Sequence, residues 1–213
     1  MSRRPTFDGP SQTFDGNVAF KVTWVYGQDG PFTTPCTPEG RHINIKQRKA
    51  TWCRQSDCPC KQLYDAGNES PYDRTTLDRW PCYDSAIFDK WSFGGGRFHG
   101  ESRGGEPIPF KNFRLGKLAF FTTRHHGMGE EDRIIIGCYR IDKSVSDPDF
   151  DILVAAAGDF CLRVEDFEKA PKFWAFHKQA GKPHWGTGLF RYLPDEEAEA
   201  MLEAVQAVAV KVH

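Results

Sequence analysis

The sequence lacks any apolar run long enough to cross a membrane. Its longest strictly apolar stretch, Ile152 to Ala157, has six residues, whereas a spanning helix needs about 18 or more. It also lacks an excess of either charge, since 28 Lys and Arg against 29 Asp and Glu give a formal net charge of −1. That balance argues against a protein that is basic over its whole surface. The first residues contain no apolar segment, so we expect no secretory signal and a cytoplasmic location.

The charges are unevenly distributed along the chain. Between Arg41 and Lys117 there are 14 Lys and Arg against nine Asp and Glu, a local net charge of +5, and most of the balancing acids follow later. Such unevenness is typical of ordinary solvated surfaces, and it also fits a protein with one basic face for nucleic acid. Charge alone leaves both interpretations open.

Strand and helix patterns are clearest outside residues 31–84. Alternating, β-rich stretches predict strands at 18–25, 42–45, 117–123, 133–141, 152–157 and 160–164. Helices are expected at 84–91, 173–176 and 194–208. The last of these begins at a proline, has acids in its first turn and repeats apolar residues on one face. We expect residues 1–17 to form a flexible tail and 18–213 to form one domain, interrupted by an irregular insertion over 31–84.

Seven cysteines, an odd number, indicate free thiols or metal ligands more than a disulfide framework. Zn²⁺ takes four soft ligands in a tetrahedron, at about 2.3 Å, and closely spaced thiolates can supply them. Zinc binding would also explain how so irregular an insertion is ordered. We therefore predict a structural zinc site whose ligands are Cys53, Cys58, Cys60 and Cys82. Cys36 or His42 could take the place of Cys82 as the fourth ligand. The C-x4-C-x-C spacing is uncommon for zinc, and buried free thiols are the alternative.

A distinctive order of motifs runs from Phe88 to Ile141. The pair Trp91-Ser92 precedes a glycine-rich loop. The turn Gly116-Lys117 then leads into a strand that ends in Phe-Phe-Thr-Thr. After a polar connection, a second strand follows with the sequence Ile-Ile-Ile-Gly-Cys-Tyr-Arg-Ile. This order resembles the PUA-like barrels of the EVE and YTH readers of modified bases. A tail beginning Trp-Gly-Thr-Gly-Leu-Phe at position 185 resembles EVE-like modules of modification-dependent restriction proteins. Lys117 stands where the EVE pattern has an acid, and the insertion has no counterpart there.

The resemblance implies an α+β fold, namely a PUA-like (EVE/YTH-type) mixed β-barrel flanked by helices, with a Cys-rich, zinc-braced insertion. It also implies an aromatic cage for a flipped base, which would be held by stacking at ~1–3 kcal/mol per ring and by hydrogen bonds to its Watson–Crick edge. The candidate cage residues are Trp24, Tyr26, Trp91, Ser92, Phe93, Phe121, Thr122 and Thr123. Candidate contacts to the phosphate backbone are Arg97, Lys111, Arg114, Arg124, His125 and His126. Each aromatic residue taken singly is more often a core residue than a cage wall.

These features predict a nucleic-acid-binding reader that captures methylated or hydroxymethylated cytosine in DNA, as the recognition module of a modification-dependent restriction or defence system. No convincing nuclease motif occurs in the sequence, so we expect a binding module; either cleavage belongs to a nuclease domain or subunit, or the chain only binds. We expect no membrane partner. An RNA-binding PUA-like or YTH-like reader remains open. So does a metal-dependent hydrolase or nuclease that uses His99, His125, His126 and the acids Glu130-Glu131-Asp132.

Overall fold

The structure is a computed structural model that describes residues 15–56, 58–67, 82–96, 106, 108–146, 151–155, 160–178, 182–186 and 188–211. It has an α+β fold. The strands are β1 (Asn17–Lys21), β2 (Ser92–Gly94), β3 (Leu118–Thr123), β4 (Ile134–Ser146), β5 (Asp151–Ala155), β6 (Cys161–Val164), β7 (Phe190–Leu193) and β8 (Ala209–Lys211). The α-helices are α1 (Pro38–His42), α2 (Pro59–Asp65), α3 (Ile87–Lys90) and α4 (Asp195–Gln206).

The sheet is mixed and is bent around its longest strand, β4. One part has the order β7-β1-β3-β4-β6-β8, and the far half of β4 continues into a smaller part with the order β4-β5-β2. The β1–β3 pair is parallel, and all other neighbouring strands are antiparallel. Among the described strands β2 pairs with β5 and β7 pairs with β1, so the sheet is open at both ends. The α+β class is confirmed, whereas the predicted closed PUA-like barrel is not.

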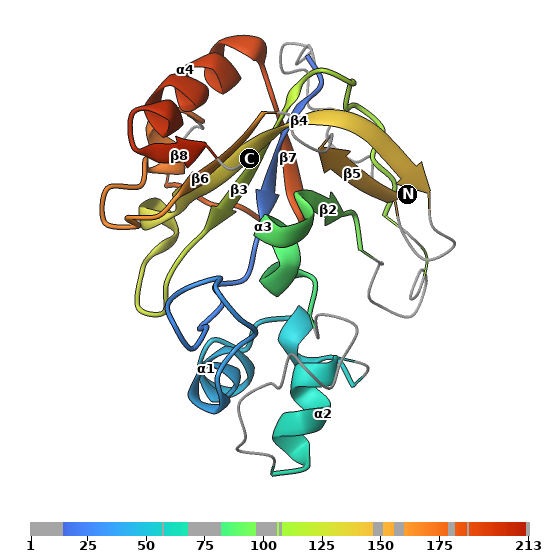
Figure 1. Cartoon of the computed structure of the whole chain (residues 1–213), viewed down its shortest axis with the longest axis vertical. Helices are drawn as coiled ribbons and strands as arrows, with labels where there is room; N and C mark the ends of the chain where they lie inside the picture. The colour runs from blue at the N-terminus through green and yellow to red at the C-terminus, as the bar shows by residue number, and fades with distance from the viewer. Residues whose placement is uncertain are drawn as a thin grey trace, which may run out of the picture.

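Strand β1 lies inside the sheet, and its continuation leads out of it. Residues 17–20 are at most 2% exposed, and β3 and β7 flank the strand on either side. Two hydroxyl groups of β3 fasten it further: the Thr122 hydroxyl donates to the Phe20 carbonyl at 2.7 Å, and the Thr123 hydroxyl donates to the Val22 carbonyl at 2.9 Å. Figure 1 shows the chain leaving β1 toward a smaller lobe that holds α1 and α2, and returning to the sheet through α3.

The closing helix α4 packs on the sheet as its sequence pattern predicts. Ala198, Met201 and Val205 are buried on one face, and the helix contacts β4, β6 and β8. Lys117, which departs from the EVE pattern, donates to both carboxylate oxygens of Asp195 at 2.7 Å. This ion pair connects the start of β3 to the first turn of α4.

The insertion is largely helical where the structure describes it. Besides α1 and α2 it contains a turn of π-helix at Ile43–Gln47 and a 3₁₀ turn at Trp52–Arg54. The strand expected at 42–45 is therefore wrong. The Thr37 hydroxyl accepts a hydrogen bond from the Gly40 amide, and Pro38 occupies the first turn of α1. These helix-starting residues determine the local structure more strongly than the short alternating pattern at 42–45.

The other long predictions are confirmed, with shifts at the element ends. The strands expected at 117–123, 133–141, 152–157 and 160–164 correspond to β3, β4, β5 and β6, and the helix expected at 84–91 is a 3₁₀ turn followed by α3. The first strand begins at Asn17, which we had expected to end the tail, and the rest of that tail before residue 15 lies outside the described residues. The short strands β2, β7 and β8 were not predicted. No described helix is long and apolar enough to span a membrane.

Replacement of Phe121 by alanine should destabilise the fold strongly. The ring is fully buried and lies against five other aromatic residues, Phe20, Phe88, Trp91, Phe93 and Tyr139. We expect Phe121→Ala to lower the free energy of unfolding by about 3–5 kcal/mol, because it removes buried contacts and leaves a cavity. Urea denaturation measures this change. Leu115→Ala is the control, since Leu115 is 61% exposed, and equal effects of the two variants would contradict the packing described here.

Candidate nucleic-acid interface and thiol cluster

Five cations lie within electrostatic range of one another near the end of β1, and two of them, Arg124 and Arg133, pair with the carboxylate of Glu130. They come from segments far apart in the sequence: the end of β1, the chain after the π-helical turn, the two flanks of the β3–β4 connection, and β7. Their charges act on one another or on Glu130. We call this group the basic cluster; its members are Lys21, Arg48, Arg124, Arg133 and Arg191.

The pairing of Glu130 with Arg133 organises the basic cluster. Arg133 donates to both Glu130 oxygens, through Nε to Oε1 and through Nη2 to Oε2 at 3.1 Å. Nε of Arg124 lies 3.6 Å from the same carboxylate. The Arg133 side chain is only 1% exposed, and its guanidinium stacks 4.7 Å from the centre of the Trp185 ring. A deeply buried guanidinium is thus held by one carboxylate and one indole ring.

The cations of the cluster repel one another. Burial lowers the pKa of Lys21, and the charges of Arg133, Arg124 and Arg48 lower it further, against the opposing effect of Glu130. Burial also lowers the pKa of Arg48. For Glu130, burial raises the pKa, but the hydrogen bond and charge of Arg133 and the charge of Arg124 outweigh burial, so that the pKa is lowered overall. One carboxylate does not balance the cations, and an incoming anion would relieve their repulsion.

Two polar groups beside the cluster are buried without a partner. Among the described residues, neither the Tyr26 hydroxyl nor Nη1 of Arg48 has a hydrogen bond of acceptable geometry. The two groups nevertheless lie close enough for Arg48 and the His126 backbone to lower the pKa of Tyr26, against the larger effect of burial, which raises it. Buried polar groups normally have partners, and here the Tyr26 hydroxyl and the Arg48 guanidinium are buried beside each other at the edge of the basic cluster.

An aromatic group adjoins the basic cluster. The Trp24 ring lies edge-on to His125 with centroids 5.1 Å apart, and the Tyr26 ring lies 5.8 Å from His125. Phe32 and Phe167 close the inner side of Trp24 at 5.8 and 5.3 Å. Trp24 is buried, Tyr26 is half-buried and His125 is exposed. Predicted cage residues and predicted phosphate contacts therefore meet here, at Trp24, Tyr26, Arg124, His125 and His126.

The other predicted cage residues form part of the core. Trp91, Ser92, Phe93, Phe121, Thr122 and Thr123 are at most 9% exposed. Both threonine hydroxyls donate to carbonyls of the β1 segment, which leaves neither proton for a base edge. Trp91 ends α3 in the left-handed conformation, with φ 43°, and its ring packs against Phe88 and Phe121. In this conformation the burial favours the alternative that the sequence left open, in which these aromatic residues are core residues.

The predicted phosphate contacts divide between the two ends of β3. Lys111 and Arg114 are exposed and lie before the strand, whereas Arg124, His125 and His126 follow it. Six residues of strand span about 20 Å, so the two groups do not form one site. Arg97 lies outside the described residues.

The sequence did not indicate that Lys21, Arg48, Arg133 and Arg191 belong to one site, or that Glu130 pairs with Arg133. Two of them carried a signal: Lys21 interrupts the apolar run of the first strand, and Arg133 directly precedes an isoleucine triplet. A charge next to a core strand needs a partner. That signal predicts pairing, but it does not identify the partner.

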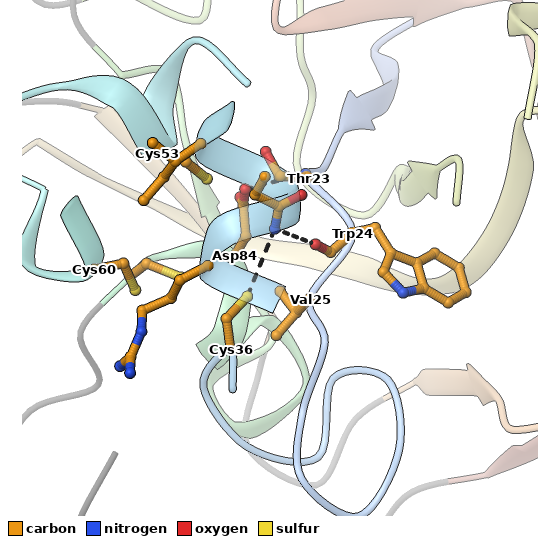
Figure 2. Close-up of a pocket in the computed structure, with 11 residues that line it drawn as sticks. Thr23, Trp24, Val25, Cys36, Cys53, Cys60 and Asp84 are labelled. Carbon is orange, nitrogen blue, oxygen red and sulfur yellow. Dashed lines mark hydrogen bonds between the residues drawn. The ribbon is translucent and has the colours of Figure 1, made fainter. Parts of the chain in front are cut away.

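A second feature of the structure is a small cavity among thiols. The cavity holds about 10 Å³, which is roughly the room of one water-sized particle and too little for a nucleobase. Figure 2 shows Cys36, Cys53 and Cys60 around one region, with the Trp24 indole turned away from it. The residues that line the cavity include four cysteines (Cys36, Cys53, Cys60 and Cys82), the buried Arg41 and Asp84.

The thiols interact with one another. Contact with the Cys58 and Cys82 thiols, together with burial, raises the pKa of the Cys60 thiol. Burial raises the pKa of Cys53, and the charges of Asp84, Cys82, Cys36 and Cys58 raise it further. Burial likewise raises the pKa of Cys36 to about 12. We call Cys36, Cys53, Cys58, Cys60 and Cys82 the thiol cluster.

Within the described ranges, no three Cys, His, Asp or Glu side chains stand in an arrangement that would hold a metal ion. The thiols therefore gather around the cavity without converging on one point. None of the seven cysteines forms a disulfide bond in the described part of the chain. His42, an alternative ligand in the sequence, contacts the Tyr64 hydroxyl through Nδ1 at 3.1 Å and is not among the residues that line the cavity. Cys138 and Cys161 are buried in β4 and β6, as expected for core thiols.

Two of the three acids invoked for a hydrolase are engaged in ion pairs. Glu130 pairs with Arg133, and Asp132 pairs with Lys172 at 2.8 Å. His125 contacts aromatic rings, and His99 lies outside the described residues. These pairings do not favour a metal-bound water held by the Glu130–Asp132 turn.

Comparisons with protein-family models, with curated proteins and with solved structures found no match. The interpretation of the two clusters therefore rests on their geometry and charge.

Replacement of Glu130 by glutamine should destabilise the protein in a pH-dependent manner. Loss of the carboxylate leaves the buried Arg133 guanidinium uncompensated, which costs about 3 kcal/mol. The folded pKa of Glu130 is lowered, so its stabilising effect is complete above the ordinary carboxyl range near pH 4.5 and is lost as the pH falls through the folded pKa. Denaturant titrations of wild type and variant at several pH values should show the difference shrinking in acid.

Glu131→Gln is the matched control for this experiment, because Glu131 is the exposed neighbour of Glu130 in the same turn. We expect its free energy of unfolding to stay within about 0.5 kcal/mol of wild type. If Glu130→Gln were no more destabilising than Glu131→Gln at pH 7, the ion pair would not hold the basic cluster together.

Proposed function

We propose that this chain is a nucleic-acid-binding module that reads a modified base, and that the basic cluster is its phosphate-binding site. The observation that carries the proposal is the gathering of five cations from five segments within electrostatic range of one another, with the carboxylate of Glu130 paired to two of them. Folding brings like charges together at a cost, and a bound phosphate would offset that cost through charge-assisted hydrogen bonds to the guanidinium groups.

Features of the fold support a PUA-like interpretation. The parallel pairing of β1 with β3, the long antiparallel β3–β4 hairpin and the Trp91-Ser92 step between α3 and β2 occur in the order in which the sequence resembles EVE and YTH readers. The sheet is open among the described strands, so the barrel itself is part of the proposal. Its binding side would be the end of β1, where the basic cluster lies.

In the proposed complex the phosphate and the base occupy adjoining places. Lys21, Arg48 and Arg124 would hold the phosphate, which positions the strand without reading it. An extruded base would then reach the half-buried Tyr26 and the exposed His125, whose rings lie next to the cations. Stacking on such faces offsets part of the cost of removing a base from the helix. The Tyr26 hydroxyl is available to donate to the captured nucleotide.

The modified base that we propose is methylated or hydroxymethylated cytosine in DNA, within a modification-dependent restriction or defence system. In such a system this chain recognises the modification, and cleavage belongs to a separate nuclease domain or subunit. The RNA-reading alternative uses the same cations and rings, and the experiment below separates it from DNA reading.

Fluorescence anisotropy with labelled oligonucleotides tests the proposal. Single- and double-stranded DNA with cytosine, methylcytosine or hydroxymethylcytosine, and matched RNA, are titrated at two salt concentrations. Arg124→Gln should weaken binding about tenfold and reduce the dependence of log affinity on log salt by about one. Tyr26→Ala should remove the preference for the modified base while leaving salt dependence in place, because the cations remain.

Lys111→Gln is the matched control, since Lys111 is an exposed cation at the opposite end of β3. It should bind as wild type does. Binding that does not depend on salt would exclude a phosphate-based interface. Equal affinity for modified and unmodified DNA would exclude base reading, and tighter binding to RNA would replace DNA as the ligand.

A further inference from the structure

We propose that the thiol cluster binds one zinc ion through Cys53, Cys58, Cys60 and Cys82, and that this ion fastens the helical insertion to the end of β1. The site is separate from the proposed base-reading surface, although Arg48 interacts with residues of both. The inference does not depend on nucleic-acid binding.

The four ligands are chosen by what each thiol already contacts. Cys60 contacts both Cys58 and Cys82, and Cys53 lies within electrostatic range of the same two thiols and lines one cavity with Cys60 and Cys82. Three of them line a cavity with room for about one small particle. Convergence on an ion requires rotation of cysteine side chains between staggered positions, which costs little compared with the formation of Zn–S bonds.

Cys36 also lines the cavity, but its sulfur is already engaged. It accepts the Asn44 side-chain amide at 3.6 Å and interacts with the Tyr26 backbone. The second Asn44 contact, Nδ2 to the Trp24 carbonyl at 2.8 Å, keeps this amide in place. Cys36 therefore belongs to the surroundings of the site. Asp84 is likewise engaged, since it accepts the Thr23 backbone amide at 3.0 Å.

The charge around the cavity suits a zinc–thiolate centre. Four thiolates on Zn²⁺ leave two excess negative charges, which must be compensated in a buried place. Arg41, which lines the same cavity, is 2% exposed, and Arg48 lies within electrostatic reach of Cys53. These guanidinium groups provide the compensating positive charge.

The ion would connect three parts of the insertion that are short and weakly structured on their own. Cys53 lies in a three-residue turn, Cys58 and Cys60 flank the start of the seven-residue α2, and Cys82 directly precedes the segment that returns to the sheet. Helices this short are marginal without tertiary support. Bonds from one ion to all three segments would supply that support.

Metal analysis of the full chain, purified under reducing conditions and dialysed, tests this proposal. Wild type should contain or take up one zinc per chain in competition with a chromogenic chelator, and Co²⁺ in its place should give the visible bands of a tetrahedral thiolate centre. Cys60→Ser should lose the bound metal, because it removes the thiol that contacts two others. Chelation should lower the unfolding temperature of wild type and leave that of Cys60→Ser unchanged.

Two variants serve as controls. Cys138→Ala removes a thiol buried in β4 and should retain one zinc, and Cys36→Ser should retain it as well. Failure of the reduced wild-type chain to take up zinc would overturn the proposal, and loss of zinc in Cys36→Ser with retention in Cys53→Ser would overturn the ligand assignment. Each result is obtained without nucleic acid, so a negative outcome here leaves the proposed reader function to its own test.

Discussion

The parallel pairing of β1 with β3 is the constraint on which both clusters depend. It buries β1 between two strands and fixes where the chain leaves the sheet. Beyond Lys21 several backbone groups bond to other segments: Val22 donates to Thr122, Thr23 donates to Asp84, and the carbonyls of Trp24 and Tyr26 accept from Asn44 and Thr37. These bonds fix the path of the chain after the strand ends. The basic cluster begins at its start, and the thiol cavity lies along its length.

Electrostatic interactions determine the arrangement of the basic cluster. Arg133 is buried at the base of the β3–β4 connection because Glu130 and Trp185 hold it there. The surrounding cations then share a carboxylate that is already engaged. Partly buried cations held close together cost stability through charge repulsion and desolvation, and sites that bind anions commonly accept that loss. This cost is the reason that we propose an anionic ligand for the basic cluster.

The two clusters are neighbours and share Arg48. This residue interacts with Tyr26 and Arg124 on one side and with Cys53 on the other. A charge change at the thiols would consequently be felt by the group that we assign to phosphate binding. The helical insertion, which has no counterpart in the EVE pattern, then has a physical role: it brings a guanidinium and a set of thiols to the end of β1.

The sequence alone determined the elements that local pattern controls. Apolar alternation identified β3, β4 and β6, and the acids and apolar spacing after Pro194 identified α4, because each of these elements buries one continuous face. It also identified Trp24, Tyr26, Arg124, His125 and His126, which the fold brings together. Only the tertiary structure decided that Trp91 and Phe121 are core residues, that the described part of the insertion contains α1 and α2, and that Lys21, Arg48, Arg133 and Arg191 lie within electrostatic range of one another. The reason is physical: burial and charge pairing depend on distances between residues up to 170 positions apart, and no local pattern encodes those distances.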